Sequence, residues 1–140
     1  MRFASLGSGS EGNGLVVESG GTRVLIDCVF GGRGAATRLG RLGLAPSSIT
    51  AILVTHEHSD HVGGVPAFAR QHDIEVWITF GTHAAVSKRF DGMSKVRCFN
   101  GNRREPLEIG ELTITPVPVQ HDAREPVQYV VGDGAHRVGV

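Results

Sequence analysis

Three histidines and one aspartate lie within six residues of this sequence, at His56, His58, Asp60 and His61. The residues before them, Ala51 to Val54, are all apolar and favour a short strand from Ala51 to Thr55. Side chains two positions apart in an extended chain point to the same side, so His56 and His58 can converge on one divalent ion. Asp60 and His61 follow the extended run, and a second ion close to the first would account for them. The spacing therefore predicts a metal centre at the end of a strand.

The kinds of ligand restrict the metal. Neutral imidazole and carboxylate groups suit zinc or manganese, and also iron, whereas a cysteine-rich site is absent. His121 follows another predicted strand, Leu112 to Val119. A third imidazole there would complete a three-histidine site with one open position, the arrangement that gives a catalytic metal a bound water. The alternative is a set of surface histidines in a loop, but the spacing His-x-His-x-Asp-His after an apolar strand is far more specific than a lone pair.

The same spacing resembles the signature of the metallo-β-lactamase-fold hydrolases. Other segments resemble the bacterial YycJ-type (WalJ-type) branch of that family, and the resemblance covers nearly the whole chain. These segments are Met1 to Asn13 with its glycine-rich loop, Leu25-Ile26-Asp27, and His121-Asp122 followed by Glu125-Pro126-Val127. The sequence departs from the family pattern at Val29, where a glycine is common in the family.

The resemblance implies how the ligands are divided between one or two divalent ions, with zinc or manganese expected and iron compatible. The first ion would be bound by His56, His58 and His121, whereas Asp60 and His61 would belong to the second. Two ions that share a water would lower its pKa and stabilise the anionic oxygens of a phosphoryl or acyl centre. Asp60 would be the catalytic group that holds or accepts the proton of that water.

Two features outside the histidine motif belong to the expected site. The resemblance implies that Asp27 orients the metal ligands, since a ligating imidazole needs its other nitrogen held; the alternative is a cap for the next loop. The loop from Gly7 to Asn13 fits G-x-G-x-x-G, but a strand and not a helix follows it, so we reject a dinucleotide site. Its Ser8, Ser10 and Asn13 could hydrogen-bond a substrate oxygen, or the loop is a plain turn.

The elements that must position these residues begin as an antiparallel meander. Gly20-Gly21 predicts a hairpin turn between strands at Leu15 to Glu18 and Thr22 to Asp27. Strands and helices then alternate up to Thr79, which implies right-handed crossovers in a partly parallel sheet covered by helices. Thr82 is expected to cap a helix that runs through Phe90. Short strands follow at Lys95 to Phe99, Leu107 to Ile109, Leu112 to Val119, Gln128 to Val131 and Arg137 to Val140.

These patterns predict an α/β fold in layers, with a mixed sheet and flanking helices. With the resemblance, we expect residues 1–140 to form a single domain, the N-terminal half or somewhat more of a metallo-β-lactamase αββα sandwich. In the resembled fold a bridging aspartate and a final histidine come later, so the domain is expected to be incomplete. If the chain ends at Val140, an unpaired sheet edge and an uncovered apolar face favour a homo-oligomer.

Charge and cysteine content give few further restrictions. Lys plus Arg and Asp plus Glu are both 14, so net charge argues neither for nor against a nucleic-acid partner. Between Lys88 and Arg104, six basic residues outnumber one acid, which is either a solvated surface or a contact for nucleic acid. Cys28 and Cys98 are 70 residues apart, so we expect no structural disulfide. The sequence has no apolar leader and no apolar run of membrane-spanning length, so we expect a cytoplasmic protein without a membrane partner.

The expected function is that of a metallo-hydrolase, a phosphodiesterase or exonuclease-like nuclease acting on DNA. The resemblance supplies the substrate class, because YycJ-type proteins are nucleases that act on DNA ends. One alternative is hydrolysis of a small ester, thioester or lactam on the same scaffold, since the metal motif fixes the nucleophile and not the electrophile. Another is a chain that binds metal, or packs against a partner, without catalytic activity.

Overall fold

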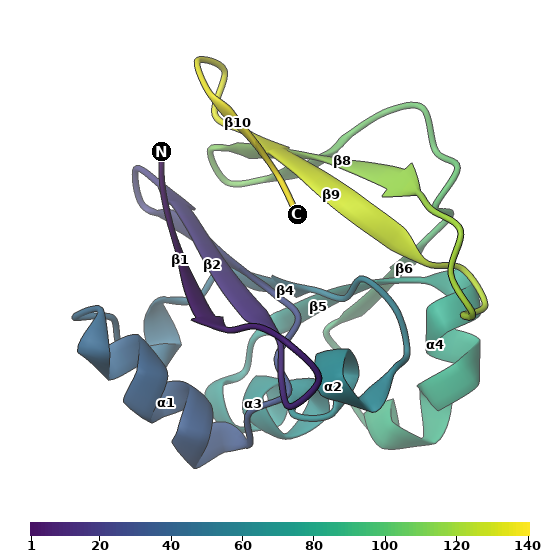
Figure 1. Cartoon of the computed structure of the whole chain (residues 1–140), viewed down its shortest axis with the longest axis horizontal. Helices are drawn as coiled ribbons and strands as arrows, with labels where there is room; N and C mark the ends of the chain where they lie inside the picture. The colour runs from purple at the N-terminus through teal and green to yellow at the C-terminus, as the bar shows by residue number, and fades with distance from the viewer.

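A computed structural model describes all residues from Met1 to Val140 and contains two β-sheets that face each other (Figure 1). The first sheet has six strands. The first three strands pair antiparallel with one another, and the third strand then begins a series of four parallel strands. Its strands, in order across the sheet, are β1 (Arg2–Gly7), β2 (Gly14–Ser19), β3 (Thr22–Ile26), β4 (Ala51–Leu53), β5 (Glu75–Thr79) and β6 (Val96–Phe99). The predicted meander and the predicted parallel crossovers are both present.

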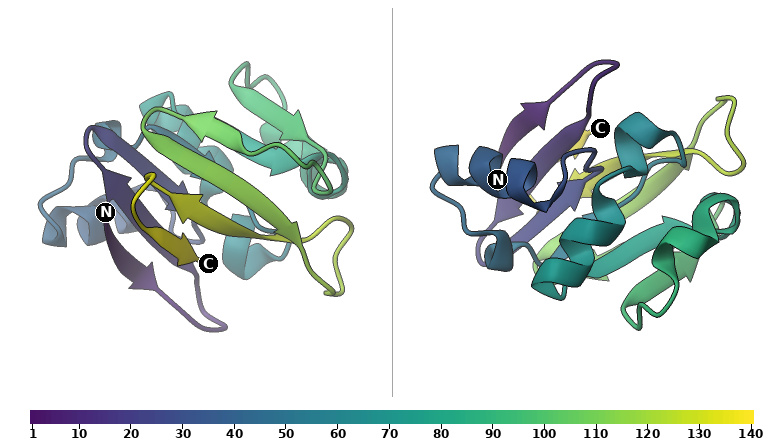
Figure 2. Two further views of the ribbon diagram at one scale, coloured as in Figure 1. Left: turned by 90° about the horizontal axis from the view of Figure 1, so that it is seen from above. Right: turned by 90° about the horizontal axis from the view of Figure 1, so that it is seen from below.

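Helices cover one face of this sheet, as the view from below shows most directly (Figure 2). The helices are α1 (Gly32–Arg41), α2 (Ser59–Val62), α3 (Val65–His72) and α4 (Phe80–Val86), with 3₁₀ turns at Pro46–Ser48 and Ser87–Phe90. Between helices and sheet lies a core in which Leu25, Ile52 and Phe68 are fully buried. None of the helices has the length and apolar content that a bilayer crossing requires.

The second sheet lies over the opposite face of the first (Figures 1 and 2). It is antiparallel, with the strands in the order β10 (Arg137–Gly139), β9 (Val127–Gly132), β8 (Leu112–Pro118) and β7 (Leu107–Ile109). A second core fills the space between the sheets, where Val24 of β3 and Ile114 of β8 are fully buried. The buried Tyr129 of β9 donates a hydrogen bond from its hydroxyl to the carbonyl oxygen of Val54, at 2.7 Å. The expected layered α/β architecture, a mixed sheet with flanking helices, is confirmed.

Two local predictions need correction, and one short helix was missed. The cap of α4 is Thr79 and not Thr82, because β5 runs directly into the helix and the Thr79 hydroxyl accepts a hydrogen bond from the Thr82 backbone N–H at 3.3 Å. Strand β4 ends at Leu53 and not at Thr55, because the Thr55 backbone N–H leaves the sheet ladder and donates to the Asp27 carboxylate. Helix α2 was not predicted, since its four residues are too few to show a helical period.

Candidate metal centre

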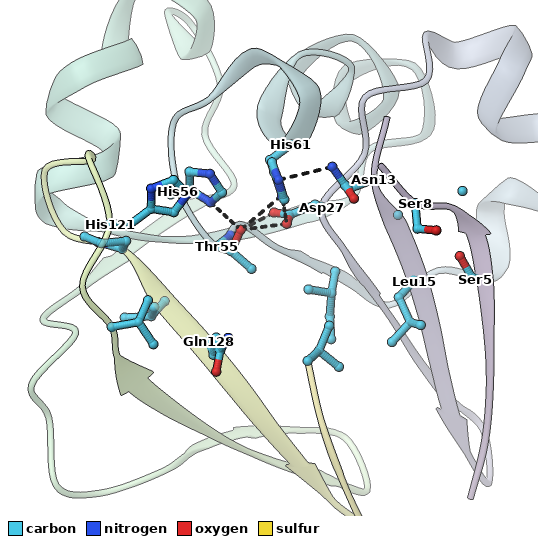
Figure 3. A pocket seen from close by; sticks show the side chains of 17 residues that line it. Ser5, Ser8, Asn13, Leu15, Asp27, Thr55, His56, His61, His121 and Gln128 are labelled. Atoms are coloured by element: carbon cyan, nitrogen blue, oxygen red, sulfur yellow. Dashed lines mark hydrogen bonds and ion pairs between the residues drawn. The ribbon is translucent and has the colours of Figure 1, made fainter. Parts of the chain in front are cut away.

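The candidate site lies between the two sheets, at the edge where the parallel strands of the first sheet end (Figure 3). His56 and His58 follow β4, Asp27 follows β3, and Asp60 and His61 lie on α2. His121 comes from the loop between β8 and β9 in the second sheet. The carboxyl ends of parallel strands are the usual place for a binding site in such sheets.

The structure brings three of the predicted residues into one cluster. One possible ligand atom from each of His56, His58 and His121 lies within 4.8 Å of the others. Their ring centroids are 4.6 Å apart for His56 and His58, and 4.5 Å apart for His56 and His121. His56 is buried, His58 is half-buried and His121 is exposed, so the cluster opens to solvent on the side of the second sheet. The spacing of ligand atoms suits a single ion bound by three imidazoles.

In each of these rings one nitrogen lies within hydrogen-bond distance of a group of the protein. His56 Nδ1 lies 2.9 Å from the Thr55 hydroxyl, and His58 Nε2 lies 3.1 Å from the backbone carbonyl oxygen of Asp122. His121 Nδ1 lies 2.5 Å from a carboxylate oxygen of Asp122 and also faces the Asp122 backbone N–H at 2.9 Å, so these contacts hold the ring without selecting its tautomer. The Asp122 carbonyl oxygen can only accept, so His58 Nε2 carries the proton and His58 Nδ1 keeps its lone pair. The Thr55 hydroxyl donates to Asp27, so it accepts from His56 Nδ1 and leaves the lone pair on His56 Nε2. A metal-binding imidazole needs this arrangement.

His56 gives the clearest sign that the residues fit a metal. Its Nε2 is buried and has no hydrogen-bond partner in the protein, as expected of the nitrogen that would bind a metal. Burial lowers the pKa of His56 to about 4, and the neighbouring His61 contributes in the same direction. His56 is therefore neutral at neutral pH, with a lone pair available on Nε2. The three imidazoles satisfy the requirements of a zinc-type site.

Asp27 lies behind the cluster and links two of the histidines. One carboxylate oxygen, Oδ1, accepts a hydrogen bond from the Thr55 backbone N–H at 2.8 Å. The other, Oδ2, accepts from the Thr55 hydroxyl at 2.6 Å and from His61 Nδ1 at 2.7 Å. Thr55 therefore transmits the orientation of Asp27 to His56 (Figure 3). The backbone φ of Asp27 is +55°, a conformation that aspartate and asparagine tolerate better than most residues.

Asp60 and His61 lie beside the three-histidine cluster and not within it. The His61 ring is 4.1 Å from the His56 ring between centroids, and its Nε2 is 3.6 Å from Asp60 Oδ2. The hydrogen bond to Asp27 raises the pKa of His61, while burial opposes that rise. The amide nitrogen of Asn13 lies 3.1 Å from His61 Nε2 and 3.3 Å from Asp60 Oδ2. These two residues, which the resemblance assigned to a second ion, thus face the glycine-rich loop.

The glycine-rich loop forms one wall of a cavity of about 360 Å³ beside the histidines. Ser8 and Asn13 line this cavity, whereas Ser10 is exposed outside it. Asn13 also fixes the loop itself, because its side-chain oxygen accepts from the Gly9 backbone N–H at 3.2 Å. Val29, the departure from the family pattern, packs against Gly12, where an added Cβ would lie 2.1 Å from a Val29 methyl carbon.

The other histidines, the two cysteines and Thr55 complete the comparison with the sequence analysis. His83 and His136 lie outside the cluster, and the Nδ1 of His136 lies 3.5 Å from an Asp133 carboxylate oxygen. Cys28 is fully buried, and neither Cys28 nor Cys98 forms a disulfide in the structure. The sequence argument missed Thr55. The usable signal was its position directly before His56, at the end of a strand that neighbours the one ending in Asp27.

Comparison with known proteins gives consistent results. A family model described as the β-lactamase superfamily domain matches residues 22–139. The exodeoxyribonuclease YycJ of Bacillus anthracis is 30% identical over 129 residues, which are 92% of this chain and 49% of that protein. Ribonuclease Z of Methanopyrus kandleri is 29% identical over 131 residues, which are 86% of this chain and 46% of that protein. The chain thus spans about half the length of the curated relatives it matches.

A solved structure with the same fold is MEM-A1, a subclass B3 metallo-β-lactamase from a soil metagenome library. It superposes with a TM-score of 0.73 and 20% identity, covering 98% of this chain and 58% of that one. At this level of identity the likeness concerns the fold alone, and it agrees with the two facing sheets and the helical layer described above.

Proposed function

Because the chain belongs to the β-lactamase superfamily, with a metallo-β-lactamase fold, we propose that it contributes the metal-binding half of a hydrolase that cleaves nucleic-acid phosphodiesters. The observation that carries the proposal is the cluster of three imidazoles, in which His56 and His58 each have one nitrogen held and the other free. Zinc suits this donor set best, and manganese is the second choice. A divalent ion bound there would supply Lewis-acid chemistry, polarising a phosphoryl oxygen and lowering the pKa of a water molecule.

The side chains around the proposed ion would have different roles. His56, His58 and His121 would hold the ion, and Asp27 with Thr55 would keep His56 in the tautomer that presents Nε2. The side chain of Asp60 is one-third exposed, so its carboxylate can accept a proton from solvent-accessible substrate or water at Oδ2. Asp60 and His61 would together support a second ion. That ion would replace the Asn13 amide as the partner of Asp60 Oδ2 and His61 Nε2.

DNA is the substrate that we propose, with RNA as the nearest competitor. The relatives named above include one exodeoxyribonuclease and one ribonuclease, and these names support a nucleic-acid substrate without choosing the sugar. The basic segment between Lys88 and Arg104 contributes less than its composition suggested. Lys95 and Arg97 form ion pairs at 2.6 Å with Asp73 and Glu75, so their charges are already partly balanced.

The test combines metal analysis with three substrates. We expect the purified chain, or a longer form that contains it, to bind zinc stoichiometrically and to hydrolyse end-labelled DNA in preference to RNA and to a chromogenic lactam. His58→Ala should remove both metal and activity, whereas His83→Ala, in the helical layer, should retain both. Preferred RNA cleavage would change the substrate, and preferred lactam cleavage would favour the small-molecule alternative. Activity that survives in a metal-free His58→Ala protein would overturn the proposal.

A further inference from the structure

The candidate metal centre depends on how the two sheets dock. His56 and His58 follow a strand of the first sheet, whereas His121 lies in residues 119–126, the connection between β8 and β9 of the second sheet. We call residues 119–126 the His121 loop. Three imidazoles can meet only if this loop is held against the first sheet. The residues that attach the loop therefore determine whether the three ligands come together.

Glu125 attaches the His121 loop to the first sheet through both carboxylate oxygens. Oε2 accepts a hydrogen bond from the Gly81 backbone N–H at 2.6 Å, and Oε1 accepts one from the Gly101 backbone N–H at 2.7 Å. Gly81 lies in α4, directly after β5, and Gly101 lies directly after β6. The charge of the carboxylate strengthens both bonds. One side chain thus ties the loop to the ends of two neighbouring strands.

The main chain of Glu125 is held as well. Its carbonyl oxygen accepts hydrogen bonds from the Thr79 hydroxyl at 2.9 Å and from the Thr82 hydroxyl at 3.3 Å. A Cβ atom added to Gly81 would lie 2.6 Å from the Glu125 Cβ, and one added to Gly101 would lie 2.9 Å from a Val127 methyl carbon. The glycines therefore allow an approach that a larger residue would prevent.

A second carboxylate holds the same loop from the histidine side. Glu57, between the two candidate ligands His56 and His58, accepts a hydrogen bond at Oε1 from the Arg124 backbone N–H at 2.8 Å. Beyond the loop, the Val127 backbone N–H donates to the Thr55 carbonyl oxygen at 3.0 Å. Arg124, Glu125 and Val127, which follow His121 by three, four and six residues, are thereby fixed to the first sheet near its strand ends.

We propose that Glu125 is a positioning residue for His121, which sets the third imidazole at the distance from His56 and His58 that one ion requires. The inference rests on the proposed function, because it assigns Glu125 a purpose in metal binding. Glu125 does not touch the ion; it acts through the backbone of the His121 loop. Without its carboxylate, two backbone N–H groups lose their acceptor, and the loop keeps only the hydrogen bonds of its main chain, which hold His121 less closely in place.

The test uses Glu125→Gln, which keeps the size of the side chain but offers one acceptor oxygen in place of two, and Glu125→Ala. Zinc affinity, measured by chelator competition, should fall by about 10- to 100-fold in Glu125→Ala, the range for residues that hold a ligand in place, and by less in Glu125→Gln. Glu111→Ala is the matched control. The Glu111 carboxylate likewise accepts from a backbone N–H of the first sheet, that of Gly21 at 2.9 Å, but at the turn between β2 and β3, away from the histidines.

Two further readouts separate positioning from general destabilisation. In urea denaturation of metal-free protein, Glu125→Gln and Glu111→Ala should shift the unfolding midpoint by similar amounts, so a fall in zinc affinity confined to Glu125→Gln cannot come from lost stability. In metal-free protein, the imidazole NMR signals of His121 should broaden or shift in Glu125→Gln and stay unchanged in Glu111→Ala. Unchanged zinc affinity together with unchanged His121 signals in Glu125→Gln would refute the inference. Failure of the wild-type chain to bind zinc, with the His121 signals still altered, would instead refute the proposed function.

Discussion

Asp27→Asn tests whether the network behind the histidines controls the candidate metal centre. Asparagine has nearly the same shape and tolerates the positive φ of +55° at this position, so the change concerns hydrogen bonds above all. The introduced amide oxygen must face the Thr55 backbone N–H, which can only donate. The introduced amide N–H₂ then faces the Thr55 hydroxyl and His61 Nδ1, two groups that donate to the carboxylate in the wild type.

The consequences reach both histidines. The Thr55 hydroxyl loses its acceptor and can donate only to His56 Nδ1, which moves the proton of His56 to Nε2, the buried nitrogen that would bind metal. His61 must likewise carry its proton on Nε2, which then faces the Asn13 amide nitrogen, a second donor, at 3.1 Å. One substitution thus blocks one lone pair and creates one contact between two donors.

The expected magnitudes follow from these two effects. Zinc affinity should fall by about 10- to 100-fold, as for other residues that hold a metal ligand, or about 1.4 to 2.8 kcal/mol. The metal-free protein should lose about 1 to 3 kcal/mol of unfolding free energy, the cost of leaving a buried polar group without a partner. Chelator competition measures the first quantity and urea denaturation the second.

Asp73→Asn is the matched control for the backbone. Asp73 also has a positive φ, +54°, but it is exposed and forms an ion pair with Lys95, away from the histidines. It should change zinc affinity by less than about 2-fold, since exposed pairs contribute little. Unaltered zinc affinity in Asp27→Asn would show that Asp27 caps the loop after β3 and does not orient the ligands.

Three further predictions concern other parts of the molecule. His56→Ala should abolish stoichiometric metal binding whereas His83→Ala retains it, and metal retained in the His56 variant would contradict the site. Burial raises the pKa of the Cys28 thiol to about 12, so iodoacetamide at pH 8 should leave Cys28 unmodified until the protein unfolds; rapid alkylation of folded protein would contradict its burial. The side-chain hydrogen bond from Arg2, aided by Arg23, holds the pKa of Glu18 below its usual value. Glu18 therefore contributes stability above its unfolded-state pKa that is lost as pH falls through the lowered folded-state pKa, and Glu18→Gln should weaken the acid dependence of the urea midpoint below about pH 5. An identical acid dependence in the two proteins would refute this assignment.

Much of the fold could be predicted from local patterns. The Gly20-Gly21 hairpin and the alternation of strands and helices are signals that neighbouring residues carry by themselves. The end of β4 could not be predicted in this way, since it depends on the Asp27 carboxylate, 28 residues away, which competes for the Thr55 N–H. The cap of α4 was assigned to Thr82 because both threonines are good caps and only the exact end of β5 distinguishes them.

The candidate site shows the same division. The motif from His56 to His61 and the position of His121 after a strand were sufficient to predict the cluster of three imidazoles. The role of Glu125 was not visible, because its hydrogen-bond partners are 44 and 24 residues away, on elements whose proximity only the folded chain creates. Ser10 illustrates the opposite error, since a polar residue in the right loop is exposed outside the cavity.

Because the three imidazoles follow strands of two different sheets, a metal ion bound by all three would act as a thermodynamic cross-link between the sheets. His58 and His121 are 63 positions apart in the sequence, so an ion held by both binds only chains in which the sheets have closed on each other. At a free concentration of 100 times its dissociation constant, such an ion would stabilise the closed form by about 2.7 kcal/mol. Partial opening of the second sheet would then be observed as metal release. The rate at which zinc passes to a chelator present in excess would report how often β8 and β9 separate from the rest of the protein.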